Sequence, residues 1–163
     1  MRKNIYDVFN GLVLPSELHD LFHEAQISTI VMSKAQGIVS ISLLLTTIVH
    51  PKFIEQLEEA IFSFLGYPVS MEVHINESYE LPFVLAFKDL YALYEDLLLY
   101  YIRKINPICA MSIKTSKKQI GVCEIIYEVA ATGYSYMKDF EVDQWVSGIF
   151  KEKFNLEIGR AHV

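Results

Sequence analysis

The sequence predicts an α+β fold in two small units, β-β-α-β followed by α-α-β-α-β, on three observations. Among the 163 residues, 52% are hydrophobic and 21% charged, a composition typical of a chain that buries a core. Apolar residues recur with a helical period over residues 51–65 and alternate with a period of two over residues 69–75. The polar, turn-rich residues 76–82 then separate two such patterned regions.

The first unit begins with two short helices at residues 3–9 and 16–24, the second with a serine as its N-cap. Residues 27–32 are rich in β-branched side chains, and residues 38–45 alternate apolar residues with serine. The intervening residues 34–37 contain a glycine and read as a turn. Together these segments predict a β-hairpin.

A helix at residues 51–65 follows the hairpin, with a proline in its first turn and Gly66 as its stop. The alternation over residues 69–75 predicts the last strand of this unit. We therefore expect a first domain at residues 1–76 and a linker at residues 77–83.

The second unit begins with a long apolar-striped helix that ends at Asn106-Pro107, because the residue before a proline disfavours the α conformation. A short helix to Ile113, a loop at residues 115–118 and a strand at residues 119–129 are predicted next. This domain is expected to span residues 84–157.

The remaining part of that domain is predicted as one helix from Thr132 to about Lys153. A strand is then expected to begin at Leu156.

Composition excludes several classes of function. The formal net charge of −6 and the isoelectric point near 5.3 lack the basic excess that phosphate binding needs. The two cysteines, Cys109 and Cys123, form no metal motif, so we expect two buried, reduced thiols in a cytoplasmic protein. The longest uncharged run, residues 35–51, is too short for a membrane-spanning helix.

No catalytic motif is evident. His19 and His23 are four residues apart on a predicted helix, but a zinc protease motif needs a glutamate and a third ligand. The Asp139-Phe140-Glu141 spacing suits a two-metal site only on a strand, and here it falls in a predicted helix. Phosphate-binding glycine loops and the Gly-x-x-Gly clamp of nucleic-acid-binding KH domains are also missing. With these motifs excluded, protein partner binding is the function that remains.

Two sets of residues are candidates for binding. Lys117 and Lys118 either belong to a solvated loop or contact single-stranded nucleic acid together with nearby aromatic residues. Four tyrosines of the long helix either fill the core or contact a partner; they are Tyr91, Tyr94, Tyr100 and Tyr101.

The order of elements resembles the first two N-terminal domains of the PolC-type DNA polymerase III α subunit of Gram-positive bacteria. In the first unit, the resemblance rests on Ile27-Ser-Thr-Ile-Val-Met-Ser-Lys34, on the hairpin and helix that follow, and on the strand at residues 69–75. In the second unit, it rests on Ile105-Asn106-Pro107-Ile108, the lysine-containing loop, the strand and the long helix that ends in Phe154-Asn155-Leu156-Glu157. This second domain resembles a KH-like fold and the C-terminal domain of the clamp-loader tau subunit.

The resemblance implies a non-catalytic fragment of a DNA-directed DNA polymerase with 3'-5' exonuclease activity. Its Mg²⁺, and Zn²⁺ or Mn²⁺ as a further candidate, would lie in downstream domains, and no cofactor is expected in this fragment. The implied partners are those downstream domains and replisome proteins, with clamp-loader tau, helicase or primase as candidates. DNA contact by the fragment and membrane association are not expected. The alternative is a free-standing α+β interaction or regulatory protein.

The last residues, Ile158 to Val163, have a different resemblance. With ordinary codons, Ile-Gly-Arg-Ala-His-Val is ATC GGA AGA GCA CAC GTC, which resembles a translated sequencing adapter. We therefore expect residues 158–163 to be a non-native tail that packs poorly, and the strand at Leu156 to be interrupted by it.

Overall fold

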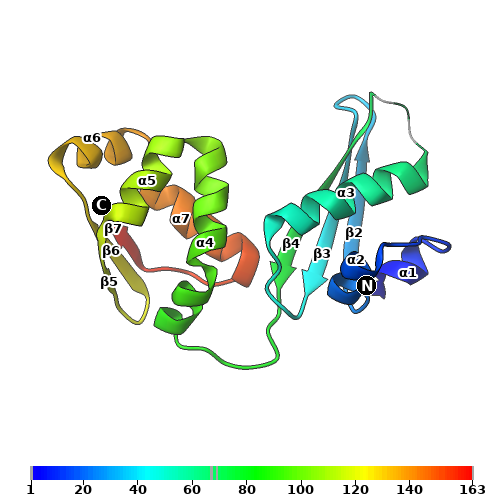
Figure 1. The fold of residues 1–163 in the computed structure, drawn as a ribbon, viewed down its shortest axis with the longest axis horizontal. Helices are drawn as coiled ribbons and strands as arrows, with labels where there is room; N and C mark the ends of the chain where they lie inside the picture. The colour runs from blue at the N-terminus through cyan, green and yellow to red at the C-terminus, as the bar shows by residue number, and fades with distance from the viewer. Residues whose placement is uncertain (1, 67, 69, 163) are drawn as a thin grey trace. The chain divides into compact units, whose positions relative to one another are not determined.

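The computed structural model describes residues 2–66, 68 and 70–162 (Figure 1). The chain divides into two compact units, Met1–Pro82 and Phe83–Val163, named here unit 1 and unit 2. Each unit contains helices and its own β-sheet, so the predicted α+β class is confirmed.

Unit 1 contains a sheet of strand order β1-β2-β3-β4, in which β1, β2 and β3 pair antiparallel and β4 joins β3 in parallel. Its elements are β1 (Lys3–Asn4), α1 (Ile5–Val8), α2 (Ser16–Phe22), β2 (Gln26–Ser33), β3 (Ile38–Leu45), α3 (Pro51–Leu65) and β4 (Glu72–Tyr79). The predicted hairpin is present, and α3 has the predicted bounds, with Gly66 in the left-handed conformation at its C-cap.

The predicted helix at residues 3–9 is wrong at its start. Lys3 and Asn4 form a strand that pairs with Ile27 and Gln26. The Asn4 side chain then accepts a hydrogen bond of 2.9 Å from the Tyr6 amide and begins the short helix α1.

The predicted linker at residues 77–83 also needs correction, because β4 continues through Tyr79. Glu77 and Tyr79 pair in register with Leu43 and Leu45 of β3. The Tyr79 side chain is buried, and its hydroxyl donates to the Val49 carbonyl at 3.0 Å. The predicted first residue of this strand, Val69, lies outside the described residues.

The core of unit 1 lies between α3 and one face of the sheet (Figure 1). Alternate residues of β3 are buried, and the serines between them are only half-buried on the opposite face. The apolar stripe of α3 packs on the buried face through Ile54, Leu57 and Ile61. A sheet that is covered on one side explains the alternating pattern of the sequence.

The Glu58 side chain of α3 covers part of the β4 edge. Its carboxylate accepts a hydrogen bond of 2.7 Å from the Ile75 amide. Burial raises the pKa of this carboxyl group, although the hydrogen bond acts in the opposite direction.

Replacing Glu58 with glutamine is expected to flatten the pH dependence of stability. The raised pKa means that the folded chain holds the proton more tightly than the unfolded chain. The free energy of unfolding therefore falls as pH rises from the unfolded-state pKa to the folded-state pKa, and the loss is complete above both. Glutamine keeps the acceptor for Ile75 without the charge, so the variant should be more stable at neutral pH.

Urea titrations from about pH 4 to about pH 8 measure this slope. The matched control is Glu59→Gln, because Glu59 is the exposed neighbour on the same helix. Equal slopes for the parent and Glu58→Gln would contradict the prediction.

Unit 2 contains a sheet of strand order β5-β6-β7, with an antiparallel β5–β6 pair and a parallel β6–β7 pair. Its elements are α4 (Phe87–Ile105), α5 (Pro107–Thr115), β5 (Lys117–Ile120), β6 (Glu124–Glu128), α6 (Ala131–Asp139), α7 (Val142–Phe154) and β7 (Arg160–His162). The helix α4 ends at Asn106 as predicted, and the Asn106 side chain caps α5.

Two predicted elements of unit 2 are each divided in the structure. The predicted strand at residues 119–129 is a hairpin, in which the Gly121 amide donates to the Glu124 carbonyl at 2.8 Å. The predicted helix from Thr132 to Lys153 breaks between α6 and α7, where Glu141 has a φ of 53°. Of the two cysteines, Cys109 is buried as expected, but Cys123 is exposed in the hairpin turn.

The C-terminal strand lies further along the chain than predicted. Leu156 and Glu157 belong to no strand, whereas β7 falls within the predicted non-native tail and pairs with residues 124–126 of β6. The backbone of this tail therefore joins the sheet of unit 2, and the expectation that the tail packs poorly stays a prediction. The side chains of Arg160 and His162, which would test its packing further, lie outside the described part of the chain.

The core of unit 2 is centred on Phe150 of α7, which is fully buried. Its ring centroid lies 5.3 Å from that of Phe87, 6.1 Å from Tyr91 and 5.8 Å from Tyr94, all on α4. Phe154, one turn along α7, stacks at 6.0 Å. These rings join α4 to α7 through apolar and quadrupole contacts.

Among the described residues, no helix is both long enough and apolar enough to cross a membrane.

Candidate functional site

The structure places two of the four candidate tyrosines in the core of unit 2. Tyr91 and Tyr94 are buried, so of the two alternatives, core or partner contact, the structure favours the core for both. The Tyr91 and Tyr127 hydroxyl groups share a hydrogen bond of 2.7 Å between α4 and β6. Burial raises the pKa of both phenols, which stay protonated at neutral pH.

Tyr100 and Tyr101 are half-buried near the C-terminal end of α4. The Lys104 ammonium lies 4.7 Å from the Tyr100 ring centroid, and the Lys153 ammonium lies 5.1 Å from that of Tyr101. One side of each ring is therefore engaged in an intramolecular cation–π contact.

The two candidate lysines lie on β5 and do not form a basic patch. The Lys118 ammonium is 3.8 Å from the Glu95 carboxylate, and its side chain is only 16% exposed. Lys117 is exposed but is paired in register with Glu128 on β6. An acidic neighbour beside each lysine weakens the attraction that a phosphate backbone would feel.

The two candidate metal patterns do not form a metal site. The His19 and His23 rings stack at 5.5 Å, and the His19 Nδ1 atom lies 2.6 Å from the Tyr6 hydroxyl. Asp139 ends α6, and Glu141 lies in the α6–α7 junction. No group of three or more His, Cys, Asp or Glu side chains in the described part of the chain could hold a metal ion.

A row of aromatic side chains follows the corner between α6 and α7. The ring centroids of Tyr136 and Phe140 are 5.0 Å apart, and those of Phe140 and Trp145 are 6.2 Å apart. Asn106 positions this row by donating a hydrogen bond of 3.2 Å to the Tyr136 hydroxyl. Phe140 remains 43% exposed, although it is the large apolar residue at the centre of the row.

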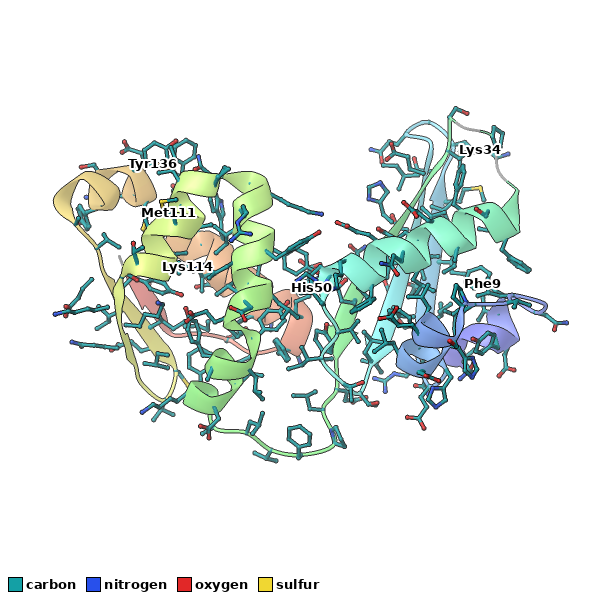
Figure 2. All side chains as sticks on the ribbon, in the orientation of Figure 1. Phe9, Lys34, His50, Met111, Lys114 and Tyr136 are labelled. Carbon is teal, nitrogen blue, oxygen red and sulfur yellow. The ribbon has the colours of Figure 1, made fainter. Side chains whose placement is uncertain are left out.

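Helix α5 provides an apolar surface beside this row. Ile108 and Met111 are more than half exposed, and Figure 2 shows Met111 and Tyr136 on the neighbouring helices α5 and α6. A groove of about 270 Å³ runs between α5, α6 and the end of β6. Gly133 and Ser112 line this groove, and α6 approaches α5 so closely there that a Cβ atom on Gly133 would lie 3.3 Å from the Ser112 hydroxyl.

We use the name α5–α6 face for a set of residues from α5, from α6 and its C-cap, and from the first turn of α7. They are Ile108 and Met111, Tyr136 and Phe140, and Trp145. The groove is small for most cofactors and is large enough for an inserted side chain. Tyrosine, tryptophan and methionine are enriched in the central parts of protein interfaces. The arrangement is suited to protein docking, since an apolar anchor could enter the groove while the aromatic row supplies contact area.

The sequence pattern did not reveal this face. Phe140 and Trp145 count toward the apolar side of a single long helix, and only the break at Glu141 brings Phe140 to the surface. The positive φ of Glu141 leaves no clear signal in the sequence, since glutamate is not a residue that favours this conformation.

No protein-family model, curated protein or solved structure matches this chain.

Proposed function

We propose that this chain docks protein partners through the α5–α6 face, and that it is the non-catalytic N-terminal part of a PolC-type DNA polymerase III α subunit. The observation that carries the docking function is the row of Tyr136, Phe140 and Trp145, in which Phe140 is 43% exposed and the other two are half-buried, together with the groove between α5 and α6. The polymerase origin rests on the order of elements in the sequence.

The charge distribution favours a protein partner over a nucleic acid. Unit 2, which carries this face, holds ten Lys or Arg and ten Asp or Glu and so lacks a basic excess, and Lys118 lies beside an internal carboxylate. The α6–α7 junction presents Phe140 and Glu141 and contains no glycine, whereas KH domains hold a nucleic-acid backbone with a Gly-x-x-Gly loop.

The partners that we propose are replisome proteins of the bacterial cytoplasm, with clamp-loader tau, helicase or primase as candidates, and the downstream domains of the polymerase. In this proposal, nucleotide transfer and exonuclease chemistry, with their metal ions, belong to those downstream domains.

The second candidate function is a free-standing α+β interaction protein. The parallel pairing of β7 with β6 favours it, because residues 160–162 form the third strand of the unit 2 sheet, as native residues do and as a translated adapter is not expected to. Sequencing the genomic DNA beyond the codon for Glu157 distinguishes the two. Downstream coding sequence for polymerase domains is expected under the first proposal, and a stop codon directly after Glu157 or Val163 would contradict it.

The docking function is tested with the single tryptophan of the chain, Trp145. A chain labelled with 5-fluorotryptophan gives one ¹⁹F resonance, which is expected to shift when the purified partner is added. Phe140→Ala should weaken binding at least about tenfold, the usual loss at the centre of an interface.

The matched control is Phe83→Ala, because Phe83 is 53% exposed and lies outside the α5–α6 face. Equal weakening by both substitutions, or no shift with any of the candidate partners, would contradict docking at this face.

A further inference from the structure

The β2 strand of unit 1 is only partly covered along its outer edge. β1 pairs with Gln26 and Ile27 alone, and β3 occupies the other edge of β2. Along residues 29–33, no described strand pairs with the outer edge. In a strand, alternate residues direct their N–H and C=O groups to each edge, so this segment presents hydrogen-bonding groups to solvent.

This open edge is unusually apolar. Ile30, Val31 and Met32 are each more than two-fifths exposed, and Val31 reaches 61%. The β2 segment carries no lysine, glutamate or proline, the residues with which proteins commonly protect an edge strand. An irregularity between Ile27 and Thr29 shifts the register where β1 ends.

The opposite edge of the same sheet, formed by β4, has a different environment. There the Ile75 amide of β4 is bonded to the Glu58 carboxylate of α3 at 2.7 Å. A carboxylate that caps this amide prevents a strand from using it. Within one sheet, therefore, a side chain occupies one amide of the β4 edge, whereas the β2 edge at residues 29–33 is apolar and open.

The occupant that fits this edge is an extended peptide segment. β1 already pairs antiparallel with β2, so an added strand would continue along the line that β1 begins. Lys3 of β1 and Lys34 of the hairpin turn lie at the two ends of the open segment, and Lys34 is labelled in Figure 2. Unit 1 holds ten Asp or Glu against four Lys or Arg in all, but these two cations flank a β2 segment without charged side chains. Locally they favour acidic residues on either side of the apolar centre of the added strand.

A second copy of the chain fits less well. Antiparallel pairing of two β2 edges about Val31 would bring Lys34 of each copy toward Lys3 of the other. Two like charges close together oppose that arrangement.

We propose that the edge at residues 29–33 of β2 binds an extended segment of another protein by strand addition, and that the segment has alternating apolar residues flanked by acidic ones. This site is in unit 1 and goes beyond the docking function proposed for unit 2.

The test uses the full chain and a synthetic peptide of alternating valine and threonine with a pair of glutamates at each end. Calorimetry measures its affinity, and hydrogen exchange locates the amides that it protects. Protection is expected at residues 29–33. Methylation of alternate peptide nitrogens, which removes the donors, should weaken binding about tenfold or more.

Val31→Lys, which places a charge on the edge, should weaken binding to a similar extent. Val122→Lys is the matched control, because Val122 is an exposed valine of unit 2. A peptide with lysine pairs in place of the glutamate pairs should bind more weakly than the acidic one. Thermal melts first establish that both variants fold.

Four results would overturn the proposal. They are absence of binding at millimolar peptide, equal affinity for the N-methylated peptide, protection confined to β4, and a dimer in sedimentation that Val31→Lys dissociates. The last result would assign the edge to a second copy of the chain.

Discussion

Replacing Phe150 with alanine is expected to lower the free energy of unfolding of unit 2 by about 3–5 kcal/mol, the usual cost of removing a buried aromatic ring. Phe150 is fully buried and contacts rings on both α4 and α7. Its removal leaves a cavity where Tyr91 and Tyr94 now pack, and both are held in place by other contacts. A loss of this size exceeds half of the stability of many small domains.

Urea titration followed by the fluorescence of Trp145, the only tryptophan, reports the unfolding of unit 2. Phe140→Ala is the matched control, since Phe140 is on the surface and its truncation should cost less than about 1 kcal/mol. Similar losses for the two variants would show that Phe150 is not the centre of this core.

Replacing Gly37 with alanine is expected to destabilise unit 1 by about 2–4 kcal/mol, which combines left-handed backbone strain with overpacking. Gly37 has a φ of +67°, and a Cβ atom there would lie 2.6 Å from the Ser70 carbonyl oxygen. The Gly37 carbonyl also accepts a hydrogen bond of 2.7 Å from the Glu72 amide at the start of β4. The backbone cannot move away from Ser70 without disturbing that bond.

Gly66→Ala separates the two contributions. Gly66 has a similar φ of +63°, but a Cβ atom there would have no neighbour within 4 Å. This variant should lose only the strain term of about 1 kcal/mol. Amide hydrogen exchange in β3 measures both losses, and equal values would contradict the role of the close contact with Ser70.

The sequence predicts the elements of unit 1 whose local signals agree with one another. The helix at residues 51–65 has an initial proline, a continuous apolar stripe and a terminal glycine, and the structure has the same bounds. The hairpin likewise combines alternation with a glycine in its turn. Where the hydrophobic periodicity, the helix caps and the turn residues all indicate the same element, tertiary packing does not change the local structure.

The secondary-structure predictions that are wrong concern residues whose conformation depends on contacts distant in the sequence. Lys3 and Asn4 extend because β2 offers them an edge, and nothing in the local pattern indicates it. Glu77 reads as part of a polar linker and yet is buried in β4. Gly121 divides one apolar run into two strands, a turn that alternation alone does not reveal.

Candidate binding residues were harder to predict than the fold. A tyrosine is equally suited to a core and to an interface, and the pattern of α4 does not decide between them. Burial decides for Tyr91 and Tyr94, whereas the exposure of Phe140 depends on a helix break that local sequence does not encode. The β2 edge could be predicted as a strand, but its exposure depends on where β1 ends.

The difference between the β4 edge and the open part of the β2 edge in unit 1 has a consequence for stoichiometry. A sheet with two open edges can join neighbours on both sides and polymerise, as in fibres. Here the Glu58 carboxylate occupies one amide on the β4 side, that of Ile75, so a strand added there would have to displace it, whereas no described strand pairs with the outer edge of residues 29–33 on the β2 side. Strand addition to unit 1 is therefore favoured on the β2 side over the β4 side, which makes one added strand per unit the favoured stoichiometry.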